Sequence, residues 1–132
     1  MLKKDSLKPA ASVLLVEDSD DVRDFVSEIL TGEGFSVSTA RNGLSAWSLI
    51  SSRYFDLVIS DMGLPDMDGE ELLRNMRRNS IGTPVLLISG VRINEAKESG
   101  FPDSQLIYKP FEVNEIKKAI FDLLNQNNSA PN

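Results

Sequence analysis

Strand-like and helix-like segments alternate along this chain, and this alternation restricts the fold more than any other feature of the sequence. Five short segments have the composition of β-strands, at residues 13–16, 35–39, 57–60, 85–89 and 106–108. Four of them are continuous apolar runs, which are typical of strands buried on both faces of a sheet. The segment at 35–39 instead alternates apolar and polar residues, so we expect it at a half-exposed sheet edge.

The segments between these strands have the periodicity of amphipathic helices. Apolar residues recur three and four positions apart at 22–30, 44–50, 72–76 and 113–124, and a weaker, shorter helix is predicted at 92–99. Asn42 is a predicted helix N-cap. We expect five aromatic residues to pack in or beside the core: Phe25, Trp47, Phe55, Phe101 and Phe111. Five alternating units predict a doubly wound α/β domain, with a parallel sheet and helices on both faces.

Composition limits the classes of protein that fit this fold. The chain has 132 residues, which is enough for one domain, and we place that domain at 11–124. It would lie between an N-terminal arm at 1–10 and a polar, structureless tail or linker start at 125–132. A net charge of −6 argues against direct nucleic-acid binding. No signal peptide or membrane span is predicted, so we expect a cytoplasmic protein without membrane contact.

The chain contains no cysteine and no histidine. This absence excludes disulfides, thiolate metal sites, cysteine nucleophiles and histidine general bases. Chemistry in this chain therefore depends on carboxylates, hydroxyls and amines.

Polar residues follow most of the predicted strands at the point where each strand ends. Glu17 and Asp18 end the first strand, Asp61 the third, Ser89 the fourth and Lys109 the fifth. In an open parallel sheet, ligands bind at the carboxyl ends of the strands. These side chains are therefore predicted to meet at one rim of the sheet.

Three carboxylates at one rim repel one another unless a cation lies between them. Ligands that are all oxygen favour Mg²⁺, with Mn²⁺ as a substitute, over zinc. The charges of three carboxylates, a divalent ion and Lys109 nearly cancel, which leaves the site able to accept a phosphoryl group. One carboxylate would act as the nucleophile and form an aspartyl phosphate.

Each of these residues also has a simpler interpretation when taken alone. Asp18, beside Ser19, is typical of a helix N-cap, and Asp61 and Ser89 are typical of turns. Lys109 is typical of a solvated surface. The functional interpretation depends on the agreement of four separate strand ends.

Four motifs in order resemble the receiver domain of two-component response regulators, over residues 13–124. They are Val-Leu-Leu-Val-Glu-Asp-Ser at 13–19, Asp-Leu-Val-Ile-Ser-Asp-Met-Gly-Leu-Pro-Asp-Met-Asp-Gly at 56–69, Pro-Val-Leu-Leu-Ile-Ser-Gly at 84–90 and Lys-Pro-Phe at 109–111. The resemblance implies a flavodoxin-like five-stranded parallel sheet with strand order 2-1-3-4-5. It also implies a signalling protein that catalyses only its own phosphorylation and dephosphorylation.

The resemblance assigns a role to each residue of the rim. Asp61 is implied to be the phosphoacceptor. Asp18 and Asp61 would bind Mg²⁺ directly, Glu17 through water and Gly63 through its backbone carbonyl. Ser89 would be the hydroxyl that reorients toward the phosphoryl group.

Lys109 is implied to pair with that phosphoryl group, next to a cis bond to Pro110. The implied donor is a phosphohistidine on a histidine kinase or histidine phosphotransfer domain. The implied output is a downstream protein partner or a covalently attached domain, and the family also admits a phosphorylation-dependent homodimer.

The sequence departs from the family pattern at two positions near the site. Leu106 stands where the family usually has an aromatic switch residue, and Tyr108 is predicted on the same face of the strand. Gly63 has no side chain to exclude water from an acyl phosphate.

Two other functions remain open at this point. The run Asp66-Met-Asp68-Gly69 superficially matches the Asp-x-Asp-Gly motif of haloacid-dehalogenase-like Mg²⁺-dependent phosphatases, although Gly63, Leu64 and Pro65 separate it from the preceding strand. A receiver-like binding module that is not phosphorylated is the other alternative. The complete set of acidic, hydroxyl and lysine residues argues against that module.

Overall fold

Strands and helices alternate through most of the chain that the computed structural model describes, residues 10–90 and 103–128. The strands are β1 (Ser12–Val16), β2 (Ser36–Ala40), β3 (Leu57–Asp61), β4 (Val85–Ser89) and β5 (Ser104–Tyr108). The helices are α1 (Asp20–Gly32), α2 (Gly43–Ser52), α3 (Gly69–Arg78) and α4 (Val113–Asn128). The short helix predicted at 92–99 lies outside the described residues.

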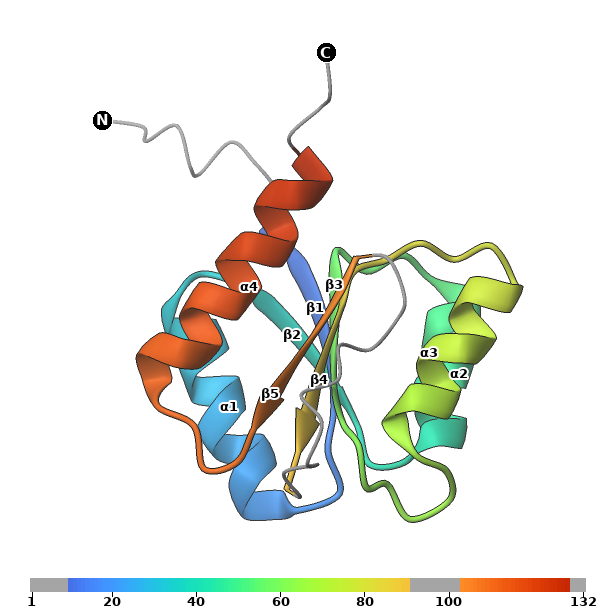
Figure 1. The fold of residues 1–132 in the computed structure, drawn as a ribbon, viewed down its shortest axis with the longest axis horizontal. Coiled ribbons are helices and arrows are strands. Elements are labelled where there is room, and N and C mark those ends of the chain that lie inside the picture. Colours follow the sequence, from blue (N-terminus) through green and yellow to red (C-terminus); the bar gives the residue numbers. More distant parts are fainter. Residues whose placement is uncertain (1–9, 91–102, 129–132) are drawn as a thin grey trace.

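All five strands are parallel and form one sheet in the order β2-β1-β3-β4-β5 (Figure 1). Helices α1 and α4 lie against one face of this sheet, and α2 and α3 lie against the other (Figure 1). The predicted doubly wound fold and its strand order are therefore confirmed. Parallel strands need such crossover helices because a tight turn cannot bring the chain back to the same end.

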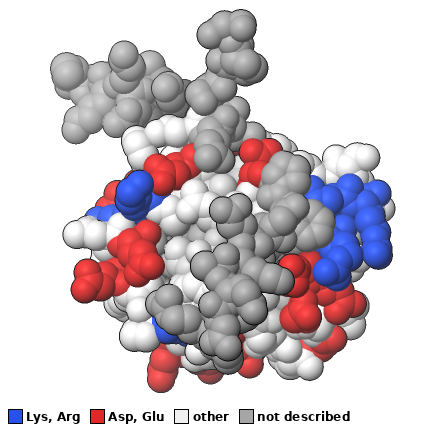
Figure 2. Space-filling model, in the orientation of Figure 1, with Lys and Arg blue, Asp and Glu red and all other residues white. Residues whose placement is uncertain are grey.

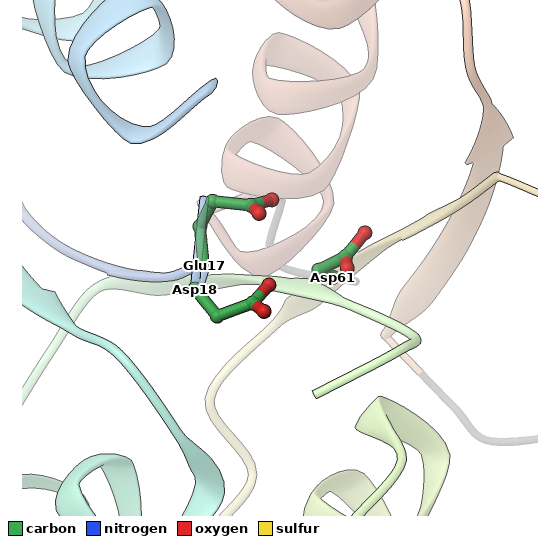
Figure 3. A group of neighbouring side chains, drawn as sticks. All are labelled: Glu17, Asp18 and Asp61. Atoms are coloured by element: carbon green, nitrogen blue, oxygen red, sulfur yellow. The ribbon is translucent and has the colours of Figure 1, made fainter. Parts of the chain in front are cut away.

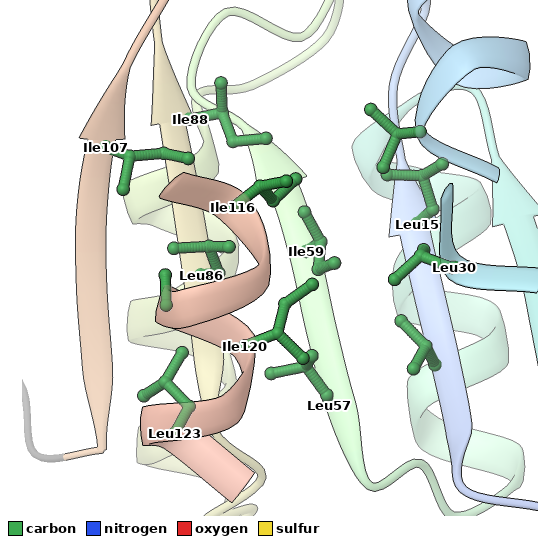
Figure 4. Packing of buried hydrophobic residues seen from close by; sticks show 13 residues of the cluster. Leu15, Leu30, Leu57, Ile59, Leu86, Ile88, Ile107, Ile116, Ile120 and Leu123 are labelled. Carbon is green, nitrogen blue, oxygen red and sulfur yellow. The ribbon is translucent and has the colours of Figure 1, made fainter. Parts of the chain in front are cut away.

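The core has two halves, one on each side of the sheet. Successive residues of a strand point to opposite faces, so Leu15 packs with α1 and α4 while Leu14 packs with α2 and α3. Figure 4 shows the first half, where isoleucine and leucine side chains from the central strands contact Ile116, Ile120 and Leu123 of α4. Because both faces are covered, β1, β3 and β4 are buried almost throughout, as their apolar runs predict.

The burial predicted from strand patterning is confirmed for one edge strand and wrong for the other. β2 lies at an edge and is only partly buried, as its alternating sequence predicts. β5 lies at the other edge, and Ile107 is its only buried residue, so the prediction that it is covered on both faces was wrong. A three-residue apolar run is too short to distinguish an edge strand from a central one.

Helix α4 extends to Asn128, so the prediction of a structureless tail from residue 125 was wrong for its first four residues. Once a helix is formed, each further residue adds a backbone hydrogen bond, and polar residues are tolerated where the helix passes the sheet (Figure 1). None of the described helices is both long enough and apolar enough to cross a membrane.

The aromatic residues follow the predicted packing with one exception. Phe55 is buried, and Trp47 and Phe111 are partly buried against the core. Phe25 is exposed instead, because it lies on the outer side of α1 beside the buried Val26. Phe101 lies outside the described residues.

Candidate functional site

Three carboxylates meet at the carboxyl ends of the two central strands. Glu17 and Asp18 directly follow β1, and Asp61 is the last residue of β3, the strand that pairs with β1. One oxygen from each carboxylate lies within 4.8 Å of the others. Glu17 and Asp18 extend toward Asp61 in Figure 3. Glu17 and Asp61 are buried while Asp18 is exposed, so the cluster opens to solvent on one side.

Lys109 reaches this cluster from the far edge of the sheet. It directly follows β5, and its Nζ lies 3.1 Å from Asp61 Oδ1 and 3.9 Å from Glu17 Oε1. The lysine side chain therefore spans the width of β4 to pair with a carboxylate on β3. The Lys109–Pro110 peptide bond is cis.

Ser89 is the last residue of β4, between the strands that hold Asp61 and Lys109. It is 5% exposed, and its backbone carbonyl accepts a hydrogen bond of 2.8 Å from the Lys109 amide. Tyr108 is its register partner on β5. Ser89 and Lys109 are thus linked through the backbone at the same rim.

Burial raises the pKa of the Glu17 carboxyl group, and the neighbouring charges of Asp61 and Asp18 raise it further. A hydrogen bond from the Ser19 amide to Glu17 Oε2, 3.0 Å long, and the Lys109 charge act in the opposite direction. The single positive charge of Lys109 does not balance the three carboxylates of the cluster. A cation bound here would relieve that repulsion.

The N-cap explanation for Asp18 is not needed, because another residue has that role. The Ser19 hydroxyl accepts the hydrogen bond from the Val22 amide at the start of α1. This leaves the Asp18 carboxylate at the rim, together with Glu17 and Asp61.

The two carboxylates of the phosphatase-like motif lie at helix N-termini. Asp66 accepts hydrogen bonds of 2.8 Å from the Gly43 amide and 2.9 Å from the Leu44 amide, at the start of α2. Asp68 caps α3 by accepting from the Glu71 amide at 2.7 Å. Neither carboxylate belongs to the cluster that faces Lys109, so the motif does not form a nucleophile and acid pair at this rim.

The donor set fits a magnesium ion. Two ligands on one Mg²⁺ lie at most about 4.2 Å apart, twice the usual Mg–O distance. The three carboxylate oxygens lie within 4.8 Å of one another, which is close to this limit. The fit is best if one carboxylate binds through water, and Glu17, whose two oxygens already face Ser19 and Lys109, suits that role.

The sequence did not predict that two further residues, Arg23 and Gly69, support the site. Arg23 donates to the backbone carbonyl of Glu17 over 3.0 Å, which holds the end of β1 against α1. Gly69 lies so close to β3 that a Cβ on it would be 2.6 Å from the Asp61 carbonyl oxygen. Both contacts join residues on different elements of the structure, so no sequence pattern within one element predicts them.

Comparisons with known proteins agree with this geometry. The family model described as the response regulator receiver domain matches residues 13–121. The probable transcriptional regulatory protein SilR of Salmonella typhimurium is 35% identical over 120 residues, which cover 89% of this chain and 52% of that protein. The chain thus spans about half the length of this curated relative.

Solved structures show the same fold. The chemotaxis response regulator CheY4 of Vibrio cholerae has a TM-score of 0.78 and 31% identity, covering 87% of this chain and 99% of that one. The signal receiver domain of a signal transduction histidine kinase from Syntrophus aciditrophicus has a TM-score of 0.81 and 28% identity, covering 92% and 96%. With the family match across most of its length, this chain belongs to the receiver domain family of two-component response regulators.

Proposed function

We propose that this domain takes a phosphoryl group from a partner phosphohistidine onto Asp61, with Mg²⁺ held by Asp18, Asp61, the Gly63 carbonyl and, through water, Glu17. The observation that carries this proposal is the pairing of Asp61 Oδ1 with Lys109 Nζ at 3.1 Å inside a cluster of three carboxylates. An Asp–Lys ion pair that only stabilised the fold would need no further carboxylates beside it. A phosphoacceptor site needs those carboxylates to bind its metal ion.

The chemical step is a displacement at phosphorus. An Asp61 carboxylate oxygen forms the new P–O bond while the P–N bond to the donor imidazole breaks. The electron pair of that bond returns to the imidazole nitrogen, which takes a proton from solvent. The donor histidine must come from a histidine kinase or a histidine phosphotransfer domain, because this chain contains no histidine.

Two side chains of this domain and the bound metal ion would hold the transferred phosphoryl group. Mg²⁺, when bound, neutralises charge on the phosphoryl oxygens and on the carboxylates. Lys109 already lies within ion-pair distance of Asp61, so its ammonium is in place to bind a phosphoryl oxygen. Ser89 is the last residue of the adjacent strand β4, and its hydroxyl would donate a further hydrogen bond.

The output would be a change of surface rather than a second reaction. Phosphorylation adds charge at the rim, and Ser89 and Lys109, linked by their backbone hydrogen bond, would move to satisfy the new oxygens. Movement of Lys109 would reach β5 and α4, which change their affinity for a downstream protein or an attached domain. Hydrolysis of the acyl phosphate by the domain itself would end the signal.

Incubation with Mg²⁺ and acetyl phosphate, followed by intact-mass measurement, tests this proposal. The native domain is expected to gain one phosphoryl group, and Asp61→Asn is expected to gain none. Asp66→Asn is the matched control, because Asp66 lies in the loop that directly follows Asp61 and does not face Lys109.

Two outcomes would contradict the proposal in different ways. No adduct on the native domain would favour the binding module that is not phosphorylated. Catalytic turnover of a phosphomonoester that Asp66→Asn abolishes would favour the phosphatase.

A further inference from the structure

A largely buried arginine lies next to the acidic rim. Figure 2 shows acidic side chains along the lower edge of the molecule, where the strands end in Figure 1. Arg23 is in the first turn of α1, and its side chain is only 12% exposed. A positive charge repels a cation, so charge alone gives no reason for a buried arginine beside a site for Mg²⁺.

The Arg23 guanidinium group contacts two acceptors, one on each side of Asp18 in the chain. Its Nη1 donates to the backbone carbonyl of Glu17 at 3.0 Å, and its Nη2 pairs with Asp20 Oδ1. The hydrogen bond and the charge of Arg23 lower the pKa of the Asp20 carboxyl group, so Asp20 stays ionised and offsets that charge. Arginine suits this position because its planar fork reaches both acceptors from one group.

Asp18 depends on its backbone for its direction. No hydrogen bond or ion pair to a residue in the described part of the chain holds its carboxylate. The Glu17 carbonyl belongs to the planar peptide unit that joins Glu17 to Asp18, so the bond from Arg23 fixes the plane from which Asp18 projects. The Glu17 amide donates to the Ala40 carbonyl at 3.0 Å, which fixes the end of β1 from the other side.

We infer that Arg23 is a positioning residue for the Mg²⁺ site and sets its affinity by orienting Asp18 through the Glu17 carbonyl. This inference rests on the proposed function, in which Asp18 is a direct metal ligand. Residues that orient metal ligands typically change metal affinity about 10–100-fold when they are replaced. Because Asp20 already offsets the charge of Arg23, positioning should outweigh the repulsion between Arg23 and the ion.

Calorimetric titration of the full chain with Mg²⁺ alone tests this inference by the sign of the change. Arg23→Gln removes a positive charge near the ion, so an effect of charge alone would tighten binding. Loss of positioning predicts the opposite, and we expect the Kd for Mg²⁺ to rise about tenfold. The Mg²⁺ concentration that gives half-maximal phosphorylation from acetyl phosphate should rise by the same factor.

Arg41→Gln is the matched control. Arg41 lies 3.7 Å from the same Asp20 oxygen but is 70% exposed, so its replacement removes the same charge and leaves the bond to the Glu17 carbonyl in place. We expect this variant to bind Mg²⁺ at least as tightly as the native domain. Thermal melts without Mg²⁺ verify that both variants fold.

Arg23→Lys separates the fork from the charge. Lysine keeps the positive charge but has one nitrogen for the two acceptors. Its Kd for Mg²⁺ should therefore lie between those of the native domain and Arg23→Gln. An Arg23→Lys domain that binds Mg²⁺ as tightly as the native one would overturn the inference, since charge would then be sufficient.

Three other results would also overturn it. Arg23→Gln could melt at a lower temperature and keep the native Kd, which would leave Arg23 a structural role only. Arg41→Gln could weaken binding as much as Arg23→Gln, which would make the effect one of charge around Asp20. A native domain that binds no Mg²⁺ would overturn the proposed metal site as well, so failure of the proposed function would show separately.

Discussion

At the residue scale, Glu17 and Asp61 are held in place by contacts that their own strands cannot supply. Glu17 is fixed by the Ser19 amide and faces Lys109, and Asp61 is fixed by Lys109. Lys109 depends in turn on the backbone bond to Ser89. The Asp61 carboxylate, the proposed phosphoacceptor, is therefore already paired with Lys109 in the domain alone.

Gly63 is the residue whose change should alter the lifetime of the phosphorylated state. A Cβ at this position would lie 3.9 Å from Asp61 Oδ2, in ordinary contact and without a clash. Gly63→Ala should therefore hinder water at the acyl phosphate and slow its hydrolysis a few-fold, measured as the decay of the phosphorylated mass. Gly82→Ala, which meets nothing within 4 Å, is the control. Equal decay in Gly63→Ala and the native domain would contradict this prediction.

At the scale of the elements, close contacts with α2 and α3 fix the loop that follows β3. The first residue of α3, Gly69, donates to the Met62 carbonyl at 2.8 Å and packs against the end of β3. Asp66 joins the loop after β3 to the start of α2. These contacts hold the loop that carries Gly63 beside the site.

Gly69→Ala should disturb β3, the strand that ends in the proposed phosphoacceptor Asp61. The new Cβ would be 2.6 Å from the Asp61 carbonyl oxygen and 3.2 Å from the Met62 Cα, which are backbone atoms that cannot rotate away. We expect a loss of about 1–3 kcal/mol in the free energy of unfolding, measured by urea denaturation, and slower phosphorylation.

Gly32→Ala is the control for this substitution, because Gly32 also lies at a helix end and meets nothing within 4 Å. A Gly69→Ala domain as stable as the native one would show that α3 can move away from β3.

Asp66→Asn should weaken the attachment of α2. The Gly43 and Leu44 amides lower the pKa of the Asp66 carboxyl group, so its charged form is favoured in the fold. A depressed pKa stabilises the fold above the ordinary value of 3.8, and this stabilisation is lost as pH falls through the lowered pKa. Because Asp66 is exposed, we expect about 0.3–1 kcal/mol at neutral pH.

Urea unfolding of the native and Asp66→Asn domains, measured from neutral pH downward, checks this prediction. The difference between them should shrink as the pH falls below 3.8. Asp24→Asn, on the exposed side of α1, is the control. A difference that persists at low pH would mean that the side chain acts through packing rather than charge.

At the scale of the whole molecule, the proposed metal site and the stability of the fold are linked. Burial of Glu17 near Asp61 and Asp18 disfavours its charged form, so the metal-free domain folds against this repulsion. A ligand that binds only the folded state stabilises it in proportion to the logarithm of its concentration, by about 2.7 kcal/mol at 100 times its Kd.

Mg²⁺ should therefore raise the melting temperature of the native domain, and Asp18→Asn should abolish most of that rise. Without Mg²⁺, Asp18→Asn should melt no lower than the native domain, because it removes one of the repelling charges. Asp66→Asn should keep the full Mg²⁺ response. An equal Mg²⁺ shift in all three proteins would place the ion elsewhere.

Much of the fold followed from patterns that are local in the chain. Strand length, helical periodicity and the alternation of the two predict a parallel doubly wound sheet because they reflect burial on one or both faces. The strand-end rule then brought Glu17, Asp18, Asp61, Ser89 and Lys109 to one rim. The partial exposure of β5 and the extension of α4 were missed, since both depend on what packs beside a segment.

The sequence by itself determined which elements form and which reactive groups lie at one rim, because burial and strand direction follow from neighbouring residues. Only the tertiary structure decided how those groups pair. Asp66 accepts a hydrogen bond from the start of α2, Lys109 pairs with Asp61, and Gly69 packs against β3. These contacts join residues that are far apart in the chain or on different elements, so neighbouring residues do not encode them. The apolar pocket between α1 and α4, lined among others by Ile29, Ile120 and Leu124, has the same origin, since a surface shared by two helices is not encoded in either alone.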